Sequence, residues 1–206
     1  MLKISVNRNQ FVANKLGSLK GETVLDLGCR DQILKKYLIG KYNYIGADVV
    51  KPLNKNKSKI LLCDLEKGIP KLKKKIDIIV ALDVLEHLDN AHLVRDQMLK
   101  LSKKKIIIAL PNMSYYKFRL NFMFKGIVSG KYPFDSFKPI DRHKWLPNYY
   151  NINNFFKDID HNWKVTAFNF ICQRRFNFLS FLFDKILSHF FPNLFVYERI
   201  YLIEKN

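Results

Sequence analysis

Acidic residues stand at the ends of several apolar segments in the first half of the chain. Asp48 ends the segment YNYIGAD, Asp64 follows ILLC, and Asp83 follows IDIIVAL. A carboxylate at the end of such a segment can accept hydrogen bonds from the vicinal hydroxyls of a ribose. Any one of them could instead cap a helix or form a turn. Because the pattern occurs three times, we expect a nucleotide-type ligand near these residues.

Other side chains that could take part in catalysis lie close to Asp83 and in the second half of the chain. Glu86 and His87 belong to the segment DVLEHL, and His143 lies in DRHKW, before an expected helix. An imidazole titrates near neutral pH, so His143 is a candidate general base for an oxygen or nitrogen acceptor. The equally simple alternative is a loop histidine that caps the helix.

A scaffold must bring these residues together, and the apolar pattern indicates which one. Continuous apolar runs predict strands at residues 23–28, 42–49, 60–65, 76–82 and 105–110, with helices at 31–38 and 90–101. Helices at 113–125, 152–159 and 178–191 and strands at 164–171 and 194–203 are expected after them. Strands that are apolar throughout and alternate with helices form parallel sheets covered on both faces. We therefore expect an α/β fold with a doubly wound, mostly parallel, seven-stranded sheet.

Five short motifs of the chain, taken together, resemble those of a known protein family. VLDLGC, YIGADV, LLCDLE, DVLEHL and IIALPN occur in this order between residues 24 and 112. Together they resemble the class I S-adenosylmethionine-dependent methyltransferases. The segments ALPN and YYKFRLNFMFKG are similar to those of MetW-like and related small-molecule members. The resemblance implies a Rossmann-like single domain over residues 1–206, with a cofactor half at about 20–112 and an acceptor side at about 113–206.

The resemblance also implies the cofactor, S-adenosylmethionine, and its binding residues. Asp48 would hold the ribose hydroxyls, and Asp64 would accept from the exocyclic amine of the adenine. The full set implied by motif position is Asp26, Gly28, Cys29, Arg30, Asp48, Cys63, Asp64, Leu65, Ala81, Leu82 and Asp83.

The loop at residues 28–32 departs from the G-x-G-x-G pattern of the family. It reads Gly28-Cys29-Arg30-Asp31-Gln32, so that only the first glycine is present. Glycine permits positive φ and close backbone approach. We expect Arg30 and Gln32 either to adopt less strained angles or to narrow the pocket. For the Arg30 side chain we expect one of two arrangements: it pairs with the carboxylate of the cofactor, or it points to solvent.

The segment from Asp83 to His87 also resembles the metal-binding E-x-x-E-H of a few methyltransferases. The same DVLEHL sequence is common in members for which no metal is implied, where the glutamate and histidine shape the pocket. From sequence we therefore expect no metal. We assign Glu86, His87 and His143 as the candidate catalytic residues.

Composition adds a charge argument. Lys and Arg number 36 against 18 Asp and Glu, which gives a formal charge of +18. Such a charge favours nucleic acid or an acidic membrane as partner. The abundance of Asn, Ile, Phe, Tyr and Lys is also what A/T-rich coding produces, which weakens that argument. Three cysteines without a C-x-x-C pair disfavour a disulfide framework and a structural zinc site. With no signal-type or spanning segment, we expect a cytoplasmic protein.

The resemblance therefore implies methyl transfer to a small-molecule, sugar or lipid-linked acceptor. Two other functions stay open. The altered 28–32 loop is compatible with a non-catalytic binding or regulatory protein of the same fold. The charge is compatible with an RNA methyltransferase, although no added RNA-binding module is visible.

The expected helix at 178–191 has one narrow polar stripe. Its members are Asn177, Ser180, Asp184 and Ser188, and the rest of the helix is Phe, Leu and Ile. So little polar surface requires extensive burial. Either the helix packs on the sheet edge, or residues 176–191 dock on a membrane or a dimer partner, with Arg174 and Arg175 meeting anionic headgroups.

Overall fold

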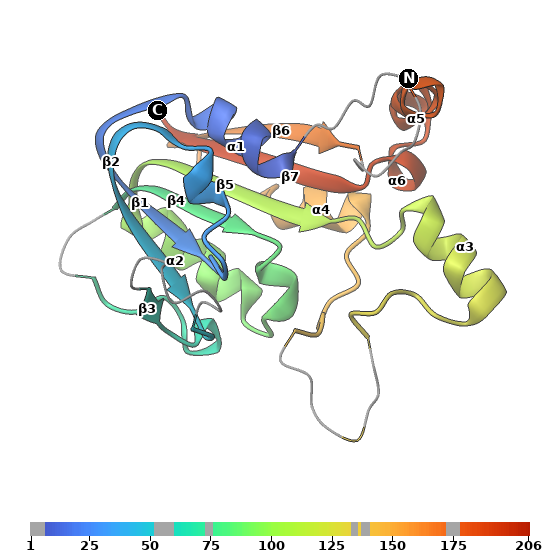
Figure 1. Ribbon diagram of the computed structural model, residues 1–206, viewed down its shortest axis with the longest axis horizontal. Coiled ribbons are helices and arrows are strands. Elements are labelled where there is room, and N and C mark those ends of the chain that lie inside the picture. Colours follow the sequence, from blue (N-terminus) through green and yellow to red (C-terminus); the bar gives the residue numbers. More distant parts are fainter. Residues whose placement is uncertain (1–6, 52–59, 73–75, 133–135, 137–140, 172–177) are drawn as a thin grey trace.

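Seven strands form one sheet in the order β3-β2-β1-β4-β5-β7-β6 (Figure 1). The computed structural model describes residues 7–51, 60–72, 76–132, 136, 141–171 and 178–206. The strands are β1 (Ser18–Leu27), β2 (Ile39–Asp48), β3 (Leu61–Leu62), β4 (Ile76–Leu82), β5 (Ser102–Pro111), β6 (Trp163–Phe170) and β7 (Glu198–Lys205). The expected seven-stranded α/β sheet is confirmed.

The first five strands are parallel, and the last two are not. β1 pairs with β2 and β4, and β5 pairs with β4, all in parallel. β7 runs antiparallel to both β5 and β6. In the centre, Leu27 pairs with Ala47 on one side and with Ala81 on the other. Hence the carboxyl ends of β1, β2 and β4 lie at one edge of the sheet.

Helices cover both faces of the sheet. On one face, α2 (Ala91–Leu101) and α4 (Tyr149–Phe155) contribute Val94, Met98 and Ile152 to a core beneath the central strands. On the other face, α1 (Arg8–Leu16) packs with the short 3₁₀ helix η1 (Leu34–Lys36). Adjacent strand residues alternate between the two cores, as a pleated strand requires.

The helix expected at residues 31–38 does not form, and one helix was missed. Residues 31–38 form turns and the single 3₁₀ turn η1 rather than a helix, because the 28–32 loop uses much of the short connection between β1 and β2. Helix α1 was not predicted. Asn7 caps its start by accepting from the Asn9 amide at 2.9 Å, and Gly17 ends it at a φ of 73°.

The remaining helices gather at one end of the sheet (Figure 1). They are α3 (Tyr116–Lys125), α5 (Phe178–Phe190) and α6 (Pro192–Phe195). Tyr116 of α3 contacts Phe195 of α6, with ring centroids 5.3 Å apart. As expected, α3 stops at Gly126, which takes a left-handed φ of 67°. In the parts of the chain that the structure describes, none of the helices is long and apolar enough to span a membrane.

Helix α5 was expected to pack its apolar side chains on the edge of the sheet, but it turns its polar stripe inward instead. Asp184 and Ser188 of its polar stripe are buried, at 1% and 6% exposure. The apolar side chains on its outer surface are exposed, among them Phe183 at 60% and Phe190 at 68%. Asn177, Arg174 and Arg175 lie outside the described residues, and the side chain of Ser180 is not described. The interpretation of α5 as an apolar helix packed on the sheet edge is therefore wrong for the side chains that the structure describes.

Candidate functional site

The strand ends meet through backbone hydrogen bonds. The Gly28 amide donates to Ala47 O at 2.8 Å, and the Cys63 amide donates to Asp48 O at 2.9 Å. These contacts join the residues after β1 and β3 to the end of β2. In an open α/β sheet, ligands bind outside the carboxyl ends of the strands. The structure thus brings Gly28, Cys29, Asp48 and Cys63 together.

Asp48 lies at the centre of this edge. Its Oδ2 accepts from the Arg30 amide at 2.7 Å, and its Oδ1 accepts from the Val50 amide at 3.0 Å. The residue is 9% exposed. Each carboxylate oxygen has two lone pairs, so both atoms can still accept one further hydrogen bond. Asp48 therefore holds the 28–32 loop and retains acceptor capacity for a ligand.

The 28–32 loop keeps a glycine-like backbone at residues that are not glycine. Arg30 and Gln32 have φ of 40° and 52°, so the first of the two expected alternatives, less strained angles, does not occur. Gly28 cannot be replaced easily, because a Cβ there would lie 2.4 Å from a methyl of Val84. The Arg30 side chain is largely exposed and reaches Asp141, with Nη1 3.3 Å from Oδ2.

The other two strand-end carboxylates have partners of their own. Asp64 caps the 3₁₀ helix η2 (Leu65–Lys67), since its Oδ1 accepts from the Glu66 amide at 3.0 Å. Asp83, with a φ of 55°, forms an ion pair with Arg8 of α1. Of the expected apolar site residues, Leu65 and Ala81 are buried in the core and Leu82 is half-buried.

Asp26 is buried beneath this edge and accepts from Tyr44 Oη at 2.5 Å. Burial raises its pKa from 3.8 to about 7, against the Tyr44 hydrogen bond, and the charge of Asp48 adds to the increase. Burial likewise raises the pKa of the Cys29 thiol to about 12 and that of Cys63. The two thiols are therefore neutral at physiological pH and are not poised as nucleophiles.

We expect Asp26 to make folding stability depend on pH. The native state keeps the Asp26 proton between about pH 4 and pH 7, where the unfolded chain has lost it, so stability falls as pH rises through that window. In Asp26→Asn this loss is absent, because the amide cannot ionise. In urea unfolding, the free energy of unfolding of the variant relative to that of wild type should rise by up to about 4 kcal/mol from pH 4 to pH 8. Asp158→Asn, at an exposed position, is the matched control. A constant difference for Asp26→Asn across this range would contradict the prediction.

A second polar group, here called the Glu86 cluster, consists of Glu86, His87 and His143. Glu86 and His87 belong to the 3₁₀ helix η3 (Leu85–His87), directly after β4. Nε2 of His87 and Nε2 of His143 each lie 3.9 Å from Glu86 Oε1. The two imidazole rings contact each other edge to face, with centroids 4.5 Å apart. The structure therefore brings the three candidate catalytic residues together.

The electrostatics of the Glu86 cluster follow from burial. Glu86 is 1% exposed, and burial raises the pKa of its carboxyl, with the charge of Asp83 adding to the increase. Burial lowers the pKa of His143 to about 4, and His87 and Lys131 lower it further. His143 is thus a neutral, weakly basic imidazole rather than one that titrates near pH 7. It does not cap the following helix, because the cap of α4 is Asn148.

Sequence reasoning missed the groups that support the strand-end residues. They are Arg8, Tyr44 and Glu198: Arg8 pairs with both Asp83 and Glu198, and Tyr44 donates to Asp26. Local pattern gives no sign of these contacts. A signal for α1 did exist, since Asn7 and Gly17 stand where helix caps are expected.

Comparison with known proteins supports the fold. Residues 11–203 match the model of the family described as methionine biosynthesis protein MetW. A search of curated proteins gave no match. Among solved structures, the small RNA methyltransferase HEN1 is similar at a TM-score of 0.64 and 15% identity, over 100% of this chain. The chain spans only 26% of the length of that protein.

Two other structures match over most of both chains. The plantazolicin methyltransferase BpumL, in complex with SAH, has a TM-score of 0.59 and 13% identity, over 96% of this chain and 82% of its own. An S-adenosylmethionine-dependent methyltransferase from Archaeoglobus fulgidus has a TM-score of 0.56 and 17% identity, over 96% and 94%. At these identities the similarity shows a shared fold.

Proposed function

The chain belongs to the MetW family, and on that premise we propose that it transfers the methyl group of S-adenosylmethionine to a small-molecule, sugar or lipid-linked acceptor. The observation that carries the proposal is the meeting of the 28–32 loop with Asp48 at the carboxyl edge of the parallel strands. This is where nucleotide-type ligands bind in such sheets. BpumL, which shares the fold, was solved with SAH bound.

The residues present fit this cofactor. Each oxygen of the Asp48 carboxylate accepts one amide hydrogen bond, from Arg30 or from Val50, and so keeps a lone pair for a ribose hydroxyl. The cofactor supplies an activated sulfonium methyl group, so the protein mainly provides alignment and a dry site. The Glu86 cluster follows β4 at the same edge of the sheet, and we assign it to the acceptor side.

The 28–32 loop favours a second candidate function. Arg30 and Gln32 hold a left-handed backbone that costs non-glycine residues about 1–2 kcal/mol each. A loop with this strain is compatible with weak cofactor binding and therefore with a non-catalytic binding protein. Calorimetric titration with S-adenosylhomocysteine separates the two candidates. Saturable 1:1 binding supports the methyltransferase, and absence of binding favours the non-catalytic protein. Retention on RNA with a steep dependence on salt would instead favour an RNA acceptor.

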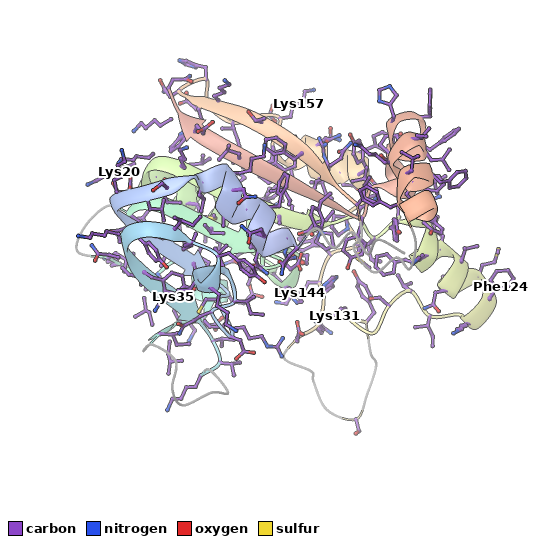
Figure 2. The ribbon with its side chains drawn as sticks, turned by 45° about the horizontal axis from the view of Figure 1, so that its top comes forward. Lys20, Lys35, Phe124, Lys131, Lys144 and Lys157 are labelled. Carbon is purple, nitrogen blue, oxygen red and sulfur yellow. The ribbon has the colours of Figure 1, made fainter. Side chains whose placement is uncertain are left out.

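The exposed apolar side chains of α3 and α5 support a lipid-linked acceptor. On α3, Phe122 and Phe124 are 58% and 76% exposed, and Figure 2 shows Phe124 at the free end of this helix, away from the sheet. Lys117, Arg119 and Lys125 are exposed on the same helix. Apolar side chains mixed with basic ones are typical of a surface that lies on anionic lipid. We therefore propose that this end of the molecule contacts an anionic membrane.

We expect the protein to co-sediment with anionic vesicles at low salt and to dissociate at high salt. Phe183→Glu and Phe190→Glu should each reduce binding severalfold, because each places a negative charge in the apolar surface next to the headgroups. Leu93→Glu on α2, at a position that is 51% exposed, is the matched control and should bind as wild type does. Absence of wild-type binding at low salt would contradict the prediction. A dimeric mass that is lost in Phe183→Glu would assign the surface to a second copy of the chain.

A further inference from the structure

The Glu86 carboxylate has no hydrogen-bond partner among the described residues. Both of its oxygens are buried and unpartnered, and the residue is 1% exposed. Buried polar groups are almost always paired, because leaving one unpaired costs the full desolvation penalty. A carboxylate that is fully buried and unpaired therefore indicates a partner that the described residues do not provide.

Two imidazoles present their Nε2 atoms to this carboxylate. His87 Nδ1 lies 2.8 Å from the backbone oxygen of Arg142, so Nδ1 carries the proton and donates. Tyr132 Oη donates to Trp145 O at 2.6 Å, so it accepts from His143 Nδ1, which lies 3.4 Å away. In neutral histidine only one nitrogen carries a proton. In that tautomer the Nε2 atom can bind a cation, and each of the two Nε2 atoms lies 3.9 Å from Glu86 Oε1.

We propose that Glu86, His87 and His143 bind a divalent transition-metal cation. A cation among these three atoms would neutralise the buried carboxylate and stabilise its charged form. The ligand atoms all lie within 4.8 Å of one another. Ligands about 2.1 Å from a tetrahedral metal are about 3.4 Å apart, so binding shortens the two Oε1–Nε2 distances by about 0.5 Å and the widest ligand pair by up to about 1.4 Å. The expectation from sequence, which was no metal, is revised accordingly.

The donor set narrows the choice of metal. Two imidazole nitrogens and one carboxylate oxygen suit Mn²⁺, Fe²⁺, Co²⁺ or Zn²⁺, whereas Mg²⁺ and Ca²⁺ prefer oxygen ligands alone. Hydrogen bonds from the outer nitrogen of a ligating histidine to a backbone oxygen or a hydroxyl fix its tautomer and orientation. His87 and His143 both have such a partner.

The chain segment that carries His143 is attached to Glu86 itself. The Lys144 and Trp145 amides donate to Glu86 O at 2.9 and 3.3 Å, and Trp145 Nε1 donates to Leu88 O at 2.6 Å. The Lys144 ammonium group adds ion pairs with Glu66 and Asp89. The three ligands are thus positioned by backbone contacts between two segments that are far apart in sequence. Three protein ligands leave coordination positions open. An oxygen atom of the acceptor would occupy one of them, an assignment that rests on the proposed function.

Titration of untagged, EDTA-treated protein with Co²⁺ tests the proposal. We expect saturable binding by calorimetry, a visible absorption band from the bound ion, and an increase of several degrees in the unfolding midpoint. Mg²⁺ should give none of these changes at the same concentration. His87→Gln and His143→Gln should each weaken Co²⁺ binding by more than about a hundredfold, since even the loss of an outer partner costs 10–100-fold.

Two further variants make the test specific. Glu86→Gln should abolish binding while leaving the metal-free protein folded, because it replaces an unpaired carboxylate by a neutral group. His161→Gln, whose side chain is 95% exposed, should bind Co²⁺ as wild type does. Absence of Co²⁺ binding by wild type, or equal binding by His143→Gln, overturns the proposal. Titration of the metal-free protein with S-adenosylhomocysteine tests the proposed function separately.

Discussion

Replacing Asp48 with alanine is expected to weaken the binding of S-adenosylhomocysteine by tens of fold or more. The variant loses two charge-assisted hydrogen bonds to the ribose, which together contribute on the order of 2–4 kcal/mol. It also releases the Arg30 and Val50 amides that the carboxylate now holds. Calorimetric titration of the wild type and the variant measures the difference directly.

The asparagine variant separates the two contributions. Asp48→Asn keeps one oxygen acceptor and the size of the side chain, but its NH₂ group cannot accept, so we expect binding between those of wild type and Asp48→Ala. Asp96→Ala on α2, with a side chain that is 50% exposed, removes a carboxylate far from the strand ends and should have no effect. Equal affinities for wild type and Asp48→Ala would show that the nucleoside does not bind at the end of β2.

The parallel part of the sheet could be predicted because its strands are apolar on both faces. The run IDIIVAL predicted residues 76–82, and β4 spans these residues. The position of the candidate site was proposed from the same pattern, since parallel strands end at one edge. The local structure of the 28–32 loop could not be predicted. Three residues with positive φ, Arg30, Gln32 and Asp83, adopt conformations that their residue types disfavour, and only tertiary contacts decide such cases.

Helix α5 shows a different limit of sequence reasoning. Periodicity reveals that a helix has a narrow polar stripe, but not which side of the helix faces the protein. Here the stripe containing Asp184 and Ser188 faces inward, and Phe183 and Phe190 face outward. The contacts of Arg8 were equally hidden, because its partners Asp83 and Glu198 are 75 and 190 residues away in the sequence.

Arg8→Met is expected to destabilise the fold by about 3–5 kcal/mol, the cost of removing one partner of a buried ion pair. Arg8 Nη1 lies 3.0 Å from Oε1 of Glu198, which is 1% exposed, and it also pairs with Asp83. Burial raises the pKa of Glu198, Asp83 raises it further, and Arg8 opposes both effects. Without Arg8, two carboxylates face each other at the end of the sheet. Urea unfolding at pH 9, where the Glu198 carboxyl of wild type is ionised, measures the loss, and Lys20→Met, at an exposed position, controls for the change in net charge.

The pH dependence of this loss identifies its cause. In Arg8→Met the native-state pKa of the Glu198 carboxyl rises above the wild-type value of about 8, so both proteins lose stability alike up to that pH and only the variant continues to lose it above. The difference from wild type should therefore be similar at pH 5 and pH 7 and should grow above about pH 8. Adding Glu198→Gln to Arg8→Met should recover much of the stability at pH 9, because no uncompensated charge is then buried. A difference that is independent of pH and not recovered by Glu198→Gln would instead attribute the effect to lost packing of α1.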